Sequence, residues 1–160
     1  MDPKRRYYFP VTGYNFRLTN LACALLCAQL ERHDEIIARR RDLFTRYREL
    51  LADVSGVGFQ PVAGWAEVAP WLFCITIDKD AYGRTRDELI HHLASHGVET
   101  RPFFLALHRL PPFREESLRR SEYLPCTDQL STQGMNLPTY STLSADDQEE
   151  IAWIIREFRT

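Results

Sequence analysis

The sequence predicts an α/β fold in which a small sheet is covered by helices and a long helix lies near the N-terminus. Three observations predict it: helical spacing of apolar residues over 21–52, the strand-like run WLFCITID at 71–78, and helical patterns over 84–96 and 144–158. The 160 residues are 44% hydrophobic and include 9 Phe, 7 Tyr and 3 Trp, which is enough for a sizeable core.

Residues 1–17 are predicted to be extended. Pro3 and Pro10 disfavour a helix there because proline lacks an amide donor and restricts the residue before it. A helix is then expected from about residue 21, with Thr19 or Asn20 as its N-cap.

The long helix is expected to run to about residue 52 with a bend at His33 and Asp34. Its second half carries a run of arginines: Arg39, Arg40, Arg41, Arg46 and Arg48. Such a run usually forms a solvated face, and contact with a phosphate or a partner is the less favoured alternative.

Two later helices carry sequence signals for their ends. Thr85 with Glu88, and Ser144 with Asp147, have capping-box spacing, although Asp is weaker than Glu in that role. Gly97 is placed to end the first of these helices in a left-handed conformation.

The rest of the chain alternates short elements. Strands are predicted at 71–78, 98–101 and 135–137, and a short helix over 117–133. The order of long helix, strand, helix, strand, helix, strand and helix favours one small sheet with helices around it.

Composition excludes several classes of protein. A net charge of −2 gives no general attraction to nucleic acid or anionic lipid, and no apolar run reaches the roughly 18 residues of a membrane span. We therefore expect a cytoplasmic protein with no nucleic-acid or membrane partner. The cysteines are interpreted as packing thiols, with Cys23 and Cys27 on a buried helix face, rather than as disulfides or metal ligands: Cys23, Cys27, Cys74 and Cys126.

No complete catalytic motif is present. His92 and His96 have a spacing that metals can use, but no third ligand lies nearby, so a structural role is favoured and no metal is expected. The G-x-S-x-G, G-x-G-x-x-G and P-loop patterns are all missing.

Two polar and aromatic clusters remain as candidate sites. In the stretch GYNFR, Asn15 and Arg17 offer amide and guanidinium donors to an anion such as phosphate. In RPFFLALH, Arg101 lies at a strand end beside aromatics and His108, which suits recognition of a phosphorylated or polar ligand. For either cluster alone, the alternative to a ligand site is a structural role in local hydrogen bonding and packing.

Together these clusters resemble the DegT/DnrJ/EryC1/StrS family of pyridoxal-phosphate (PLP)-dependent sugar aminotransferases. The family pattern G-Y-N-x-R-x-T-N-x-x-A-A-x-x-x-x-Q-L-E is matched at ten positions, with a departure at Cys23, where Ala is usual: Gly13, Tyr14, Asn15, Arg17, Thr19, Asn20, Ala24, Gln29, Leu30 and Glu31. TRPFF with Leu107, His108 and Pro111 resembles a later signature, and GMNLP with the final helix resembles the C-terminal one. The opening RRYYFPVTGYNFR is most similar to perosamine-synthetase-like members.

The resemblance implies the C-terminal lobe of a fold-type-I aminotransferase. Residues 1–20 would be a leader and interface loop and 21–160 the small domain, with the large domain that carries the Schiff-base lysine lying before residue 1. Lys4 and Lys79, the two lysines present, lack the expected sequence context. We therefore expect the chain alone to have no transaminase activity, since transamination requires the Schiff-base lysine.

By resemblance, Asn15 would reach the PLP phosphate of a partner subunit. Arg17, Arg101 and His108 would lie near a nucleotide-sugar substrate. The expected partner is a second copy or a full-length aminotransferase subunit, and the expected role is in amino-sugar biosynthesis. The alternative is a non-catalytic dimerisation or regulatory module derived from the family. A DNA-binding helical domain is a third hypothesis, with little support from the acidic net charge.

Overall fold

The structure is a computed structural model that describes residues 7–13 and 18–159. The chain divides into two compact units, and each is described by itself. The first unit comprises Met1–Glu31 and Phe103–Thr132, and the second unit comprises Arg32–Pro102 and Gln133–Thr160.

The second unit contains a four-stranded antiparallel sheet and most of the core. Its strands are ordered β1-β2-β4-β3 and span Val57–Phe59, Cys74–Ile77, Gly134–Asn136 and Arg101–Pro102, in that order. The helices of this unit are α2 (His33–Leu51), α3 (Lys79–Tyr82), α4 (Arg86–Ser95) and α7 (Ala145–Glu157). The predicted small sheet with covering helices is confirmed.

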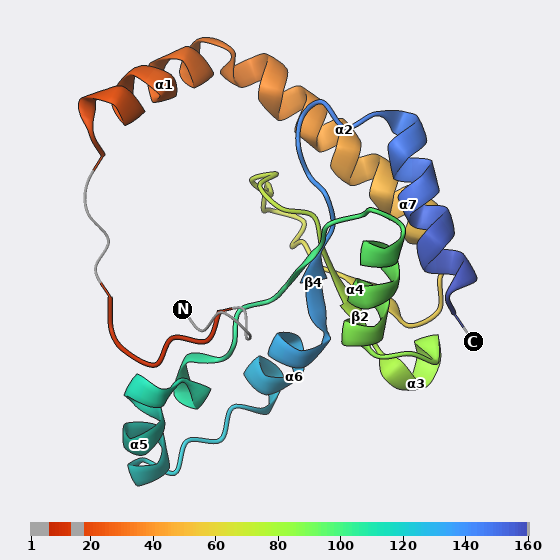
Figure 1. Ribbon diagram of the computed structural model, residues 1–160. Helices are drawn as coiled ribbons and strands as arrows, with labels where there is room; N and C mark the ends of the chain where they lie inside the picture. Colours follow the sequence, from red (N-terminus) through yellow and green to blue (C-terminus); the bar gives the residue numbers. More distant parts are fainter. Residues whose placement is uncertain (1–6, 14–17, 160) are drawn as a thin grey trace. The chain divides into compact units, whose positions relative to one another are not determined.

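Alternation along the strands explains why helices gather over the sheet. In β2, Ile75 and Ile77 are buried, whereas Cys74 and Thr76 between them are half-buried. The buried face joins Met135 of β4 in one core with the apolar faces of α2, α4 and α7. Figure 1 shows α2 and α7 lying side by side, in agreement with their packing contacts. Period-two burial on the strands and helical burial around them therefore form one hydrophobic core.

The predicted helix ends in the second unit are confirmed. The Thr85 hydroxyl accepts from the Glu88 amide at 3.2 Å, and the Glu88 carboxylate accepts from the Thr85 amide at 2.7 Å. Ser144 and Asp147 form the same reciprocal pair at the start of α7. Gly97 follows α4 with φ of +79°.

The arginines of α2 stay at least partly solvated, with Arg39, Arg41 and Arg48 exposed, and most of them also make contacts beyond their own helix. Arg40 donates to the carbonyls of Pro70 at 3.1 Å and Trp71 at 2.5 Å, and Arg48 donates to the carbonyl of Gln60 at 2.6 Å. Further pairs join Arg41 to Glu67 and Arg46 to Glu149, while Arg39 pairs with Glu35 on its own helix. Four of the five arginines thus fasten α2 to the loop 60–71 or to α7.

Several strand and helix boundaries differ from the sequence prediction. β2 is four residues long rather than eight, and β3 is only Arg101–Pro102 instead of 98–101. The predicted helix 117–133 is replaced by α5 (Pro111–Arg119) and α6 (Pro125–Gln133). The two helices form because proline is tolerated in the first turn of a helix. Pro111 and Pro125 therefore start α5 and α6 instead of preventing them.

The first unit contains α1 (Asn20–Glu31), a 3-10 turn η1 (Leu107–Arg109), α5 and α6. Thr19 caps α1, since its hydroxyl accepts from the Ala22 amide at 3.3 Å. The structure has two helices where one bent helix was predicted: α1 ends at Glu31 and α2 starts at His33. The prediction that Cys23 and Cys27 are buried is wrong: both thiols are exposed, and α1 has no buried residue.

Helix α1 presents apolar side chains to solvent along its length: Leu21 (74% exposed), Leu25 (64%), Leu26 (45%) and Leu30 (59%). Apolar surface gathered in this way drives association. We expect the chain to self-associate at tens of micromolar, and the double variant Leu21→Glu/Leu25→Glu to shift it toward monomer in sedimentation velocity. Leu118→Glu on α5, a similarly exposed leucine at 70%, is the control and should leave the distribution unchanged. A monodisperse monomer of the unmodified chain would contradict the prediction.

Candidate functional site

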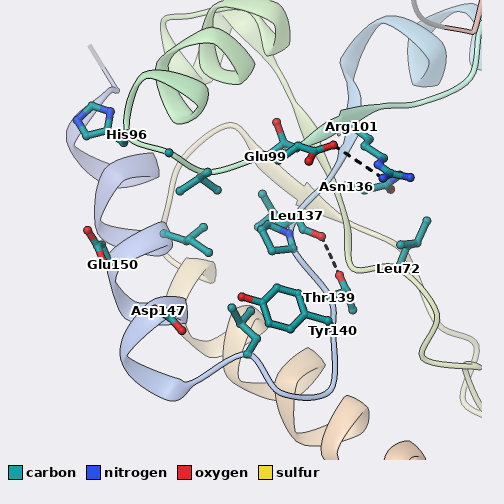
Figure 2. A pocket seen from close by; sticks show the side chains of 16 residues that line it. Leu72, His96, Glu99, Arg101, Asn136, Leu137, Thr139, Tyr140, Asp147 and Glu150 are labelled. Carbon is teal, nitrogen blue, oxygen red and sulfur yellow. Dashed lines mark hydrogen bonds and ion pairs between the residues drawn. The ribbon is translucent and has the colours of Figure 1, made fainter.

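Arg101 lies at one end of a cavity in the second unit. The cavity has a volume of about 610 Å³ and is lined by residues 96–101, by residues 136–140 at the end of β4 and just after it, and by one side of α7. Figure 2 shows Arg101 next to Asn136, its partner in the β3–β4 register, with Tyr140 and Asp147 at the opposite end. A cavity of this size can hold a ligand of a few hundred daltons.

The charges in this cavity are unevenly placed. The Arg101 side chain is 56% exposed, and its ion pair with Glu99 is long, at 3.8 Å. Glu150 and Asp147 contribute negative charge from α7, away from Arg101 in Figure 2. The guanidinium fork thus retains donors for an anion, and the acidic end favours hydroxyl or amine donors.

Thr100 is a lining residue that the sequence did not single out. It is only 6% exposed, and its hydroxyl has no hydrogen-bond partner within the described residues. A buried hydroxyl without a hydrogen-bond partner is uncommon in proteins. The Thr100 hydroxyl is therefore an unsatisfied polar group beside the cavity. Nothing in the sequence pattern separates Thr100 from the other threonines of the chain.

His108 lies in the first unit, on η1. Its Nε2 is 3.0 Å from Oδ1 of Asp128 on α6, and the two side chains are 14% and 27% exposed. The Nε of Arg109 approaches the same oxygen at 2.5 Å. Arg109, followed by the neighbouring His108, holds the pKa of the Asp128 carboxyl below its usual range. The sequence named His108 but missed Asp128, because no spacing rule connects residues twenty positions apart in different elements.

A second cavity, of about 460 Å³, adjoins this pair within the first unit. His108 lines it together with Ser117 and Arg120, and Asp128 is not among its lining residues. Arg120 is paired with Glu116 at 2.6 Å, a carboxylate that it shares with Arg119, and more distantly with Glu122 at 3.8 Å.

Asn15 and Arg17 lie outside the described residues, so their predicted roles stay predictions. The histidines of α4 are described: the rings of His92 and His96 are 4.5 Å apart, and His92 stacks on Phe158 at 4.0 Å. Burial, followed by the nearby His96, lowers the pKa of His92. Among residues 7–13 and 18–159, no group of three or more His, Cys, Asp or Glu side chains is arranged to hold a metal ion.

Comparison with known proteins assigns the family. The sequence profile of the DegT/DnrJ/EryC1/StrS aminotransferase family matches residues 1–156. The chain belongs to this family. Among family relatives, the GDP-perosamine synthase of Caulobacter vibrioides is 34% identical over 152 residues, which cover 94% of this chain and 40% of the relative. The Vibrio cholerae GDP-perosamine synthase is also 34% identical, over 96% of this chain and 41% of its own length.

Solved structures of other proteins share the fold. A structure of DesI in the presence of its TDP-sugar product matches with a TM-score of 0.78 and 30% identity, over 85% of this chain and 34% of that one. Escherichia coli GDP-4-keto-6-deoxy-D-mannose-3-dehydratase, solved with bound hydrated PLP, matches with a TM-score of 0.69 and 20% identity, over 91% of this chain and 37% of that one. This chain therefore spans about 40% of the length of the relatives it matches.

The described residues do not form a PLP site of the family's kind. Such a site needs a lysine to bond the cofactor, and Lys79 is the one lysine among the described residues. Lys79 is exposed, begins the four-residue helix α3, and lines neither of the two cavities described above. No reaction step can be assigned to PLP from this part of the chain.

No helix in the described part of the chain is both long and apolar enough to cross a membrane.

Proposed function

We propose that this chain is the C-terminal part of a PLP-dependent aminotransferase that acts on a nucleotide-linked keto-sugar in amino-sugar biosynthesis. The observation that carries the proposal is the family match over residues 1–156, together with 34% identity to two GDP-perosamine synthases over almost the whole chain.

In this proposal the chain supplies supporting groups to a site that is completed by a lysine-bearing domain elsewhere. Asn15 contacts the PLP phosphate of a partner subunit, and Arg17 lies near the same interface. The partner is a second copy or a full-length aminotransferase subunit. We also propose that the protein is located in the cytoplasm.

The cavity beside Arg101 is proposed to bind the nucleotide-linked substrate. A guanidinium donates in a planar fork that fits phosphate oxygens, which suits the diphosphate of a nucleotide sugar. The acidic opposite end, near Asp147 and Glu150, suits hydroxyl donors. The substrate is therefore expected to lie with its phosphates toward Arg101.

Replacing Arg101 tests this assignment. In calorimetric titrations with GDP and with TDP, the chain should bind at least one nucleotide, and Arg101→Ala should weaken that binding by about tenfold or more, because charge-assisted hydrogen bonds to phosphate are lost. Arg39→Ala removes the same charge from α2, where Arg39 is 52% exposed, and should have little effect. Equal losses in the two variants would contradict a site at Arg101.

The non-catalytic interaction module is a second candidate function, which the exposed apolar face of α1 favours. It predicts a stable complex with a full-length family aminotransferase and no nucleotide binding by this chain. Nucleotide titration and co-purification of the two proteins therefore separate the candidates. Nucleotide binding that depends on Arg101 would contradict the second.

A further inference from the structure

Asn136 lies in the middle of a row of three side chains on one face of the sheet. Its register partners are Arg101 on β3 and Cys74 on β2, and β4 runs between those two strands. Residues that are paired across a sheet project from the same face, whereas Met135, the preceding residue, is buried in the core on the other face. The row therefore lies on the face away from this core, and two of its members, Arg101 and Asn136, line the cavity of about 610 Å³.

The amide of Asn136 is held from the side of β2. The Sγ of Cys74 donates to Oδ1 of Asn136 at 3.1 Å, and the other acceptor near this thiol, the Leu72 carbonyl, is farther away, at 3.4 Å. A thiol carries a single proton, so the closer acceptor is favoured. Burial raises the pKa of the Cys74 thiol, which therefore keeps its proton at neutral pH and remains a donor.

This hydrogen bond determines where the nitrogen of the amide lies. The oxygen and the nitrogen of an amide project to opposite sides of the Cβ–Cγ bond, so an oxygen turned toward β2 places Nδ2 on the side of β3 and Arg101. Within residues 7–13 and 18–159, Nδ2 makes no hydrogen bond, and it is not one of the fully buried polar atoms that lack a partner. Its two N–H donors are therefore free beside the guanidinium of Arg101, which Figure 2 shows next to Asn136.

Two kinds of donor thus meet at one end of the cavity. The Arg101 guanidinium is charged and donates in a planar fork, and the neutral amide of Asn136 adds two N–H groups. A ligand with several charged oxygens, such as a diphosphate, can accept from both side chains at once.

We propose that Asn136 is a specificity-determining residue that donates through Nδ2 to the same diphosphate as Arg101, and that Cys74 is a positioning residue that turns the amide toward this ligand. That the diphosphate belongs to a nucleotide sugar rests on the proposed function. The orientation of the amide does not depend on it.

The hydrogen bond of Cys74 can be tested without a ligand, through the S–H stretching band in the Raman spectrum of the 160-residue chain. Cys74→Ser identifies the Cys74 component of this band among those of the four free cysteines. Asn136→Ala should move that component to higher frequency, because only the more distant Leu72 carbonyl remains as acceptor. Asn136→Asp retains an acceptor and should not raise the frequency. An unchanged component in Asn136→Ala would mean that the thiol donates to Leu72, and would overturn the inference.

Inorganic diphosphate is the probe for the second donor. In calorimetric titrations, Asn136→Ala should weaken its binding by about tenfold, because a hydrogen bond to a charged group is lost. Asn136→Asp keeps the size of the side chain and places a negative charge beside the ligand, so it should weaken binding further. Gln60→Ala removes an exposed amide elsewhere in the second unit and is the matched control, with no change expected. Unchanged affinity in both variants of Asn136 would contradict the proposal.

Cys74 is expected to act on the ligand only through Asn136. Cys74→Ala should weaken diphosphate binding severalfold, whereas Cys74→Ser retains a donor and should keep most of the affinity. The double variant Cys74→Ala/Asn136→Ala should bind no more weakly than Asn136→Ala alone, since no amide is left to orient. A further loss in the double variant would show that Cys74 has a different role.

Titration with GDP and TDP separates this inference from the proposed function. If diphosphate binding depends on both Arg101 and Asn136, but neither nucleotide binds more tightly than diphosphate, the nucleotide site fails and the inference stands. If Arg101→Ala weakens nucleotide binding and Asn136→Ala does not, the proposed function stands and the inference is wrong. Absence of diphosphate binding by the unmodified chain would overturn the inference, and the nucleotide titrations then decide the proposed function by themselves.

Discussion

Replacing Gly56 with Ala is expected to destabilise the second unit by about 2–5 kcal/mol, from the left-handed backbone and from overpacking together. Gly56 has φ of +81°, and a Cβ at this position would lie 2.4 Å from the Tyr82 amide nitrogen and 2.6 Å from the Tyr82 Cβ. Tyr82 has no freedom to move, because it is fully buried and its hydroxyl donates to the Ile155 carbonyl at 2.5 Å.

The matched control is Gly97→Ala. Gly97 has nearly the same φ, +79°, but nothing lies within 4 Å of an added Cβ. Its expected cost is about 1–2 kcal/mol, from the left-handed backbone alone. Urea denaturation followed by circular dichroism measures both, and the difference between the variants isolates the contact with Tyr82. If Gly97→Ala costs as much as Gly56→Ala, that contact is not responsible.

Phe73→Ala is expected to cost about 3–5 kcal/mol, a typical value for truncation of a buried aromatic side chain. Phe73 is 2% exposed, and its ring centroid lies 5.2 Å from that of Phe44, 5.0 Å from that of Tyr47 and 6.0 Å from that of Phe59. It therefore joins α2 and β1 to the segment that leads into β2. The same burial around Tyr47 raises the pKa of its phenol.

Trp71→Ala is the control for Phe73→Ala. Trp71 is two residues upstream and 70% exposed, so its loss should change the free energy of unfolding by no more than about 0.5 kcal/mol. The midpoint of urea unfolding should fall strongly for Phe73→Ala and stay in place for Trp71→Ala. A comparable shift in both would mean that the aromatic cluster contributes little.

Local sequence signals predicted the helix ends accurately. Thr85, Gly97 and Ser144 each act within a few residues, through hydrogen bonds or a backbone conformation that does not depend on distant parts of the chain. The strands at 71–78 and 98–101 were predicted too long, whereas the one at 135–137 had the right length. The length of β3 depends on its pairing with β4, a segment more than thirty residues away.

In the candidate sites too, some features were predictable from the sequence and others were not. Arg101 and His108 were recognisable as polar residues in an aromatic loop, and the family followed from the spacing of GYNFR and RPFF. The pairing of His108 with Asp128 and the fastening of loop 60–71 by Arg40 and Arg48 could not be read from the sequence. These contacts join residues of different elements, and periodicity carries no information about them.

The sequence by itself pointed to the family, through the resemblance of its motifs. It also determined the class of fold and the ends of α4 and α7, because periodicity and capping act over short stretches of chain. The tertiary structure alone decided which side chains meet. It placed a cavity beside Arg101, gave the solvated arginine face of α2 additional ties to neighbouring elements, and left the cysteines of α1 exposed. The physical reason is that burial and ion pairing depend on which elements pack together, and packing is a property of the whole core.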